Sequence, residues 1–260
     1  MLTKHNEQWI IEQSTLYNQT IIQKMLAKNL TLEQCKLFSQ MDIVSNLSKI
    51  DTSKPIMEIG PNDKFCFMGR VDTSLGSCYN KYKYYQDFEE RNFIAFSTIT
   101  NENISHYENK KISNIMFAYN VPAEAIVHVF PCDSNTWTRA ETESELTEFP
   151  SLWWSLDELN EYTKKLRVYN QITCKTKIND EILKPCALIV FDELTSQAKA
   201  IAEDFGVNII LIHSHHNSNQ NVINYNDDLM KDSMVLHKVS KQIYQDLGID
   251  YYYLKPEDFF

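Results

Sequence analysis

The sequence between residues 165 and 213 decides the fold, and its main segments are KLRVYNQITCKT (165–176), CALIVFD (186–192) and NIILIH (208–213). The first segment alternates between two sets of side chains, which is the period of a β-strand with one buried face. The other two segments are short and continuously apolar, as in strands that are covered on both faces. This pattern predicts a strand followed by a β-α-β unit.

The segment between the last two predicted strands has the pattern of a helix. Its apolar side chains recur every three to four residues, which is typical of a helix packed on a sheet. Gly206 follows and indicates the end of the helix, because glycine readily adopts the left-handed conformation found there. The apolar positions are Leu194, Ala198, Ile201, Ala202 and Phe205.

Residues 1–55 are predicted to form a helical hairpin docked on a core domain of residues 56–260. Apolar residues recur at helical spacing between Trp9 and Leu26. The sequence TLEQ at 31–34 has the form of a capping box, which predicts a second helix after it. We expect this appendage to cover the core, and a role in binding a partner protein stays open.

The remaining pattern completes an α+β fold. We expect a mixed, largely antiparallel sheet with the N-terminal helical hairpin and a C-terminal β-α-β-α extension. Further strands are predicted at 65–71, 92–98, 115–119, 125–130 and 251–254, and further helices at 155–165 and 227–247.

The composition excludes several classes of protein. The chain has 260 residues, 43% of them hydrophobic, and a formal net charge of −10, which argues against nonspecific nucleic-acid binding. No apolar run approaches the roughly 18 residues of a membrane span, and no Sec signal is visible. The six cysteines include no CxxC pair and fit reduced thiols. We expect a cytoplasmic protein, or one delivered into a host cell without a Sec signal.

Three short segments carry a resemblance to a known family. They are Arg70 on a predicted strand, FST at 96–98 on the next, and YNQ at 169–171 on a later one. In their order and polarity, these segments resemble the NAD site of the mono-ADP-ribosyltransferases found among bacterial toxins and effectors. In that family an arginine holds the phosphate and ribose side of NAD, and an aromatic-Ser-Thr strand supports the site. A later glutamate bonds the nicotinamide ribose and stabilises an oxocarbenium-like transition state.

The resemblance implies NAD as the substrate and a protein as a target for ADP-ribose. It also implies roles for six residues, with Arg70, Thr98, Tyr169 and Asn170 binding NAD and with Ser97 and Gln171 at the catalytic positions. Gln171 stands where the family has its glutamate. An amide can still hydrogen-bond a ribose hydroxyl, but it has no charge to oppose a developing cation.

Several interpretations of this departure stay open. A different acid, Glu158, Glu161 or Glu193, would supply the charge in an altered transferase. The chain would otherwise bind the nucleotide without catalysis, or the match would be accidental. In the last case Arg70 pairs with a surface carboxylate and Gln171 is a solvent-facing strand residue.

A thiol hydrolase is the alternative enzyme class. The sequence GSCY at 76–79 resembles the approach to the nucleophile of papain-like and transglutaminase-like enzymes. His128 would deprotonate Cys78, and Asp133 or Asn135 would orient the imidazole. Cysteine and histidine in such surroundings are also common packing residues, and a non-catalytic interaction protein is the third possibility.

A metal site is not predicted. Carboxylates and histidines follow the two apolar strands, where ligands of β-α-β units commonly bind. They lack the spacing of known metal motifs, so we interpret them as residues of a polar loop. These residues are Asp192, Glu193, His213, His215 and His216.

Overall fold

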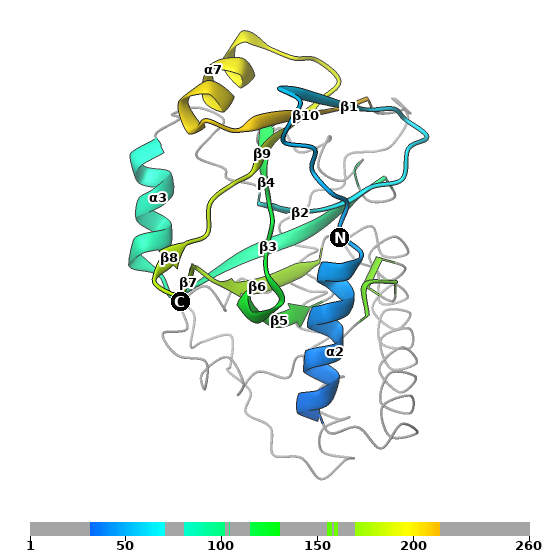
Figure 1. Cartoon of the computed structure of the whole chain (residues 1–260), viewed down its shortest axis with the longest axis vertical. Helices are drawn as coiled ribbons and strands as arrows, with labels where there is room; N and C mark the ends of the chain where they lie inside the picture. The colour runs from blue at the N-terminus through cyan, green and yellow to red at the C-terminus, as the bar shows by residue number, and fades with distance from the viewer. Residues whose placement is uncertain are drawn as a thin grey trace, which may run out of the picture.

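The computed structural model describes residues 32–70, 81–101, 104, 115–130, 155–157, 159–160 and 170–213. In these ranges an eight-stranded sheet has the strand order β1-β10-β9-β4-β2-β3-β6-β5 (Figure 1). The strands are β1 (Ile56–Ile59), β2 (Cys66–Arg70), β3 (Phe93–Thr100), β4 (Ile115–Tyr119), β5 (Ile126–Phe130), β6 (Gln171–Lys175), β9 (Ala187–Phe191) and β10 (Asn208–Ile212). The helices are α2 (Leu32–Ser45), α3 (Lys81–Glu90) and α7 (Ser196–Phe205), with a 3-10 turn η2 (Ala123–Ala125) and a small hairpin of β7 (Lys177–Ile178) and β8 (Glu181–Ile182).

The predicted β-α-β unit is confirmed. Strand β9 leads into α7 and then into β10, which pairs with β9 in parallel. The Thr195 hydroxyl accepts a hydrogen bond from the Ala198 amide and so caps the start of α7. Gly206 ends the helix in the left-handed conformation, with φ of 67°. The sequence did not reveal β1, which pairs in parallel with β10 at the edge of the sheet.

The rest of the large sheet is antiparallel, so the predicted α+β class with a mixed, largely antiparallel sheet is confirmed. Strand β3 has two partners along its length. Its first half, Phe93–Phe96, pairs with β6, and its second half pairs with β2 from Ser97 onward. The pairing partner of β3 therefore changes in the middle of the strand, from β6 to β2.

One prediction about β6 is wrong. The alternating pattern predicted one buried face, but both faces of the strand are buried, including the side chains of Gln171 and Thr173. On the first face Ile172 and Cys174 join the apolar core. On the second face the side chains are polar, and Gln171 donates a hydrogen bond to Thr173, which helps these groups to tolerate burial.

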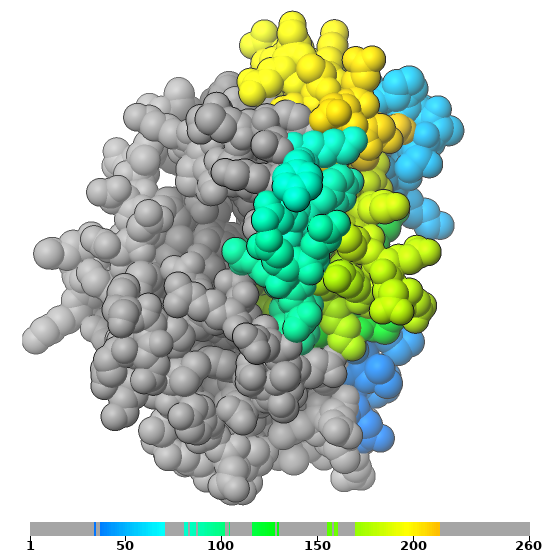
Figure 2. Space-filling view, turned by 90° about the vertical axis from the view of Figure 1, so that its left-hand side faces the viewer, coloured from blue at the N-terminus to red at the C-terminus, as the bar shows by residue number. Residues whose placement is uncertain are grey.

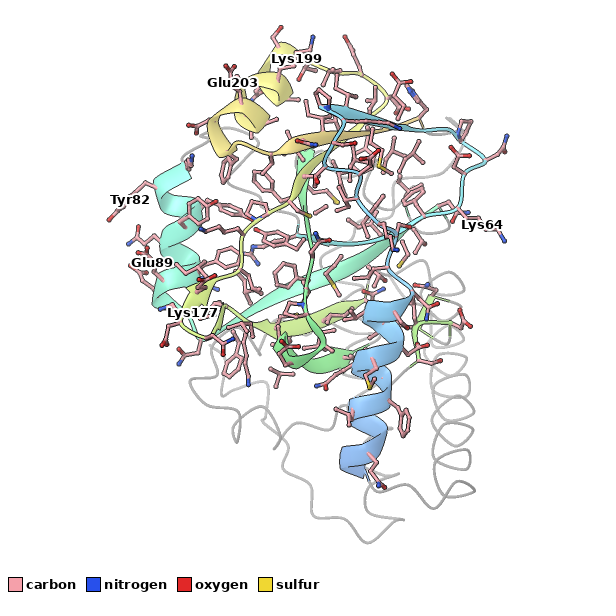
Figure 3. All side chains as sticks on the ribbon, in the orientation of Figure 1. Lys64, Tyr82, Glu89, Lys177, Lys199 and Glu203 are labelled. Atoms are coloured by element: carbon pink, nitrogen blue, oxygen red, sulfur yellow. The ribbon has the colours of Figure 1, made fainter. Side chains whose placement is uncertain are left out.

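Helices cover one face of the sheet and form the main core. Tyr84 and Phe88 of α3, Ala198 and Ile201 of α7, and Ile43 of α2 are all buried in it. Figure 2 shows the outer surface of α3 below α7, and in Figure 3 Tyr82 points away from the sheet, with 75% of its surface exposed. A second apolar cluster, which includes Phe67 and Ile99, lies on the other face. None of the helices in the described ranges has the length and apolar run of a membrane span.

Candidate functional site at the change of strand partners

The structure brings the three segments of the resemblance onto neighbouring strands. Arg70 is the last residue of β2, Ser97 and Thr98 lie in β3, and Gln171 is the first residue of β6. In the sheet β3 lies between β2 and β6. The three segments therefore meet where β3 changes partners, although they are far apart in the sequence.

Arg70 is the last residue of β2, and its side chain contacts both β3 and α3. Its Nη1 donates a hydrogen bond of 3.2 Å to the carbonyl oxygen of Ala95, in the half of β3 that pairs with β6. Its guanidinium carbon lies 5.9 Å from the centre of the Phe88 ring, within the range of a cation–π contact. An arginine has five N–H donors, and the bond to Ala95 uses one of them.

Asn170 binds the middle of β3. Its Oδ1 accepts a hydrogen bond of 2.8 Å from the amide of Thr98, and its Nδ2 donates one of 2.6 Å to the Thr98 hydroxyl. Its carbonyl oxygen accepts a bond of 2.7 Å from the Ser97 hydroxyl. The side chains of Thr98 and Asn170 are both 0% exposed. A contact of either with NAD stays a prediction, but in this structure they are buried and bonded to each other.

The predicted site residues do not line one surface. Phe96 and Ile172 pair directly and both lie in the helix-covered core. Because side chains alternate along a strand, the next residues, Ser97 and Gln171, point to the opposite face. Arg70 stacks on Phe88 of α3, and is therefore on the helix-covered face together with Thr98, which pairs with the core residue Met68. The sheet therefore lies between Arg70 and Thr98 on one side and Ser97 and Gln171 on the other. Tyr169 lies outside the described residues.

Gln171 is not the solvent-facing residue that one interpretation assumed. It is 4% exposed, and its Nε2 donates a hydrogen bond of 3.4 Å to the Thr173 hydroxyl. Burial on this face means that a ligand reaches the amide only if the surrounding side chains move. Ser97 and Thr173, which share the face, offer a ligand hydroxyl groups and no charge.

Glu193 is too far away to replace the missing glutamate. It follows β9, and the strands β4, β2 and β3 lie between β9 and β6. Four interstrand spacings of about 4.8 Å separate the two strands by ~19 Å, before any offset along the strands. Glu193 is therefore excluded as the acid for a group bound at Gln171. Glu158 and Glu161 lie outside the described residues.

The thiol hypothesis falls mostly on residues that the structure does not describe. Cys78 and Asp133 lie outside the described ranges, and for His128 only its place in β5 is described. Among the described cysteines, burial raises the pKa of Cys66 to about 12 and that of Cys186 to about 11. Burial also raises the pKa of Cys174 above the ordinary thiol range. These three thiols are protonated at neutral pH and are poor nucleophiles.

The carboxyl ends of the parallel strands bring Asp192 and His213 to the same edge of the sheet, because β9 and β10 are neighbours. His213 Nε2 lies 3.7 Å from Glu58 Oε2, and both side chains are substantially exposed. Within the described ranges no three histidine, cysteine or carboxylate side chains gather as a metal ion would require. His215 and His216 lie outside those ranges.

Asn160 is a residue of this region that the sequence did not single out. It comes from the short helical segment after Ser155, and its Oδ1 accepts a hydrogen bond of 3.3 Å from the Thr98 hydroxyl. The sequence predicted a helix there but gave no sign of which polar residue would point inward. The inward position of Asn160 depends on where β3 lies, and the sequence pattern of the helix does not contain this information.

Comparisons of the chain with protein-family models, with curated proteins and with solved structures found no match.

Proposed function

We propose that this chain binds NAD in the manner of a mono-ADP-ribosyltransferase, and that its natural partners are NAD and a protein that accepts ADP-ribose. One observation carries the proposal. Arg70, the Ser-Thr pair and Gln171 lie on three adjacent strands, and the Ser97 hydroxyl bonds to Asn170, the residue directly before Gln171. The resemblance requires that these segments be neighbours, which their separation in the sequence did not ensure. Because Arg70 and Gln171 face opposite sides of the sheet, NAD would reach both around the end of β2 and the start of β6, where these two residues lie.

The chemistry at Gln171 limits what the proposed site can do. Continuing the register of β3 and β6 by one residue places Ser97 opposite Gln171 on the same face. A hydroxyl and an amide can both hydrogen-bond the ribose of NAD. Neither carries a charge, and loss of one electrostatic contribution to a transition state commonly lowers the rate about 100-fold or more. We therefore propose binding of NAD with slow cleavage of the nicotinamide–ribose bond.

Calorimetric titration with NAD tests the binding. We expect the wild-type protein and an Arg91→Ala variant to bind NAD, and Arg70→Ala to bind it much more weakly. Arg91 is a suitable control because it is an exposed arginine close to the start of β3, so its replacement changes the net charge equally. Unfolding curves of both variants establish that each is folded during the titration. If the wild-type protein does not bind NAD, the proposal is wrong.

A Gln171→Glu variant tests the chemistry. We expect it to release nicotinamide from NAD faster than the wild-type protein, because the introduced carboxylate can stabilise an oxocarbenium-like transition state. Burial of this position raises the pKa of the introduced carboxyl group, so the gain should increase from pH 6 to pH 8 as the group ionises. Gln197→Glu on exposed α7 makes the same charge change away from the site and should have no effect. A Gln171→Glu variant that binds NAD but is no faster at any pH would refute a transferase-like arrangement at this position.

A further inference from the structure

A buried hydrogen-bond network holds the point at which β3 passes from β2 to β6. The Thr98 hydroxyl accepts a bond from Asn170 Nδ2 and donates one to Asn160 Oδ1, over 2.6 Å and 3.3 Å. A hydroxyl has one donor and two acceptor positions, so the two bonds fit together. The network thus joins β3, β6 and the helical segment after Ser155.

The helical segment is itself held in place from α2. The Leu156 amide donates a hydrogen bond of 2.6 Å to Asp42 Oδ2, so a carboxylate of α2 caps the start of that segment. Leu156 and Leu159 are buried in the helix-covered core beside the network. Asn160 is therefore fixed by packing and by the cap, and the Thr98 hydroxyl has a fixed partner on this side.

Asn170 acts on two consecutive residues of β3. Its side chain binds both the amide and the hydroxyl of Thr98 on the helix-covered face, and its carbonyl oxygen binds the Ser97 hydroxyl. Because Ser97 and Thr98 point to opposite faces, one residue fixes both faces of the strand. The backbone pairing of β3 with β6 runs from Phe93 to Phe96, and the side chain of Asn170 extends the contact beyond it.

The register of β6 decides which side chain points to which face. A slip of one residue would turn Gln171 to the helix-covered face and Asn170 to the other. The bonds of Asn170 to Thr98 are possible only in the observed register, because both groups must lie on the same face. Together with the core pair of Phe96 and Ile172, the network therefore favours the register in which Gln171 is presented next to Ser97.

From this geometry we propose that Asn170 and Thr98 are positioning residues, which hold Ser97 and Gln171 in place for the ribose of NAD. This inference rests on the proposed function for its ligand, but the positioning of Gln171 itself does not depend on NAD. The bonded network, rather than a contact with the ligand, explains why polar side chains occupy two fully buried positions here.

The test uses Thr98→Val, which removes the hydroxyl and keeps the shape, and Thr98→Ser, which keeps the hydroxyl. The matched control is Thr100→Val, since Thr100 is a buried threonine two residues further along β3 on the same face. In the full-length protein we would record the NMR signals of the Gln171 side-chain amide and measure NAD affinity by calorimetry. We expect Thr98→Val to move the Gln171 signals and weaken NAD binding about tenfold or more, as small displacements in binding sites do. Thr98→Ser and Thr100→Val should preserve both.

The outcomes separate this inference from the proposed function. If the Gln171 signals are the same in wild type, Thr98→Val and Thr100→Val, Thr98 serves the fold alone and the inference is overturned. If the wild-type protein does not bind NAD, the proposed function fails, while the NMR signals still decide whether the network positions Gln171. Should Thr98→Val not fold, Asn170→Asp takes its place, because it keeps the size of the side chain and removes the donor to Thr98. Unchanged Gln171 signals in that variant would likewise overturn the inference.

Discussion

Arg70 donates a hydrogen bond from Nη1 to the carbonyl oxygen of Ala95, and this bond joins the last residue of β2 to the half of β3 that no longer pairs with β2. The backbone pairing of β2 with β3 ends at Gly69 and Ser97, so the side chain continues the contact where the backbone ladder stops. The guanidinium also lies over Phe88 of α3. Arg70 consequently has a structural role, whatever ligand it binds.

We expect Arg70→Ala to lower the free energy of unfolding by about 1–2 kcal/mol, from the lost hydrogen bond and the lost contact with Phe88. Arg70→Lys should recover part of this, because an ammonium group can also donate to Ala95. A lysine lacks the planar fork that binds phosphate oxygens in pairs, so Arg70→Lys should still weaken NAD binding. Urea unfolding and calorimetry give the two quantities separately. Equal recovery of stability and NAD affinity in Arg70→Lys would contradict a distinct ligand role.

Gly69 is required by the close approach of Ile99. A Cβ atom at this position would lie 1.9 Å from Ile99 Cδ1 and 3.3 Å from Met116 Sδ. Both neighbours are buried in the second apolar cluster, so neither can move freely. We expect Gly69→Ala to destabilise the protein by about 1–3 kcal/mol through overpacking, as measured by urea unfolding.

The matched test is the double variant Gly69→Ala with Ile99→Val, which removes the Cδ1 atom that clashes. Ile99→Val alone should cost about 0.5–1.5 kcal/mol. Because the second change relieves the first, the double variant should be more stable than the sum of the single effects. Strict additivity would show that the clash with Ile99 is not the cause of the destabilisation.

The β-α-β unit could be predicted because its signals are local. Continuous apolar runs indicated β9 and β10, the helical stripe indicated α7, and Gly206 indicated its end. Strand β1 has no such signal, since its four residues, IMEI, follow a proline and alternate over too short a length. It becomes a strand by pairing with β10, far along the chain, as the register of Ile56 with Ile209 shows.

The sequence predicted which strands carry the candidate site residues, but not which face of the sheet each side chain takes. The sequence indicated that Arg70, Ser97 and Gln171 lie on strands, and the structure places those strands side by side. Which face each side chain takes depends on the register between distant strands, and the register is set by nonlocal pairs such as Phe96 with Ile172. Burial of Gln171 also depends on what covers the sheet, which local alternation does not reveal.

Thiol reactivity should follow the raised pKa values. The pKa of Cys186 is about 11 in the folded protein, against an ordinary value of 9.0, because burial disfavours the thiolate. Alkylation of native Cys186 by iodoacetamide should therefore rise about tenfold per pH unit between roughly pH 7.5 and 9.5, with little reaction at neutral pH. Mass spectrometry of timed samples gives the rate at each cysteine. A thiol that reacts quickly at neutral pH would have to be Cys35, Cys78 or Cys132, and reaction at Cys78 would favour the thiol-hydrolase alternative.

The same shift predicts the sign of an alkaline effect on stability. The folded state keeps the Cys186 proton at pH values at which the unfolded chain has lost it. The contribution of this thiol to stability is therefore fully present below the unfolded pKa of about 9. It is lost as the pH rises from about 9 to about 11, because over this range the unfolded chain gains free energy by releasing the proton and the folded state does not. Cys186→Ala should show a smaller decrease in the free energy of unfolding between roughly pH 8 and pH 10 than the wild-type protein, in chemical unfolding at each pH. An identical decrease would mean that this thiol does not contribute.

Asp192 directly after β9 adopts a left-handed conformation with φ of 61°, while its amide donates a hydrogen bond of 2.8 Å to the carbonyl oxygen of Ile212. Aspartate and asparagine tolerate this conformation, glycine prefers it, and a β-branched residue adopts it only with strain. We expect the free energies of unfolding of Asp192→Asn and Asp192→Gly to lie within about 1 kcal/mol of the wild-type value. The free energy of unfolding of Asp192→Val should be lower by about 1–3 kcal/mol. Asp192→Asn separates the charge from the backbone conformation, because it removes only the charge.

Glu193→Gly is the positional control. Glu193 is not among the described residues with positive φ, so a glycine there should not raise the free energy of unfolding. Guanidinium unfolding midpoints decide the matter, and an Asp192→Val variant as stable as Asp192→Asn would show that the turn does not hold the left-handed conformation in solution.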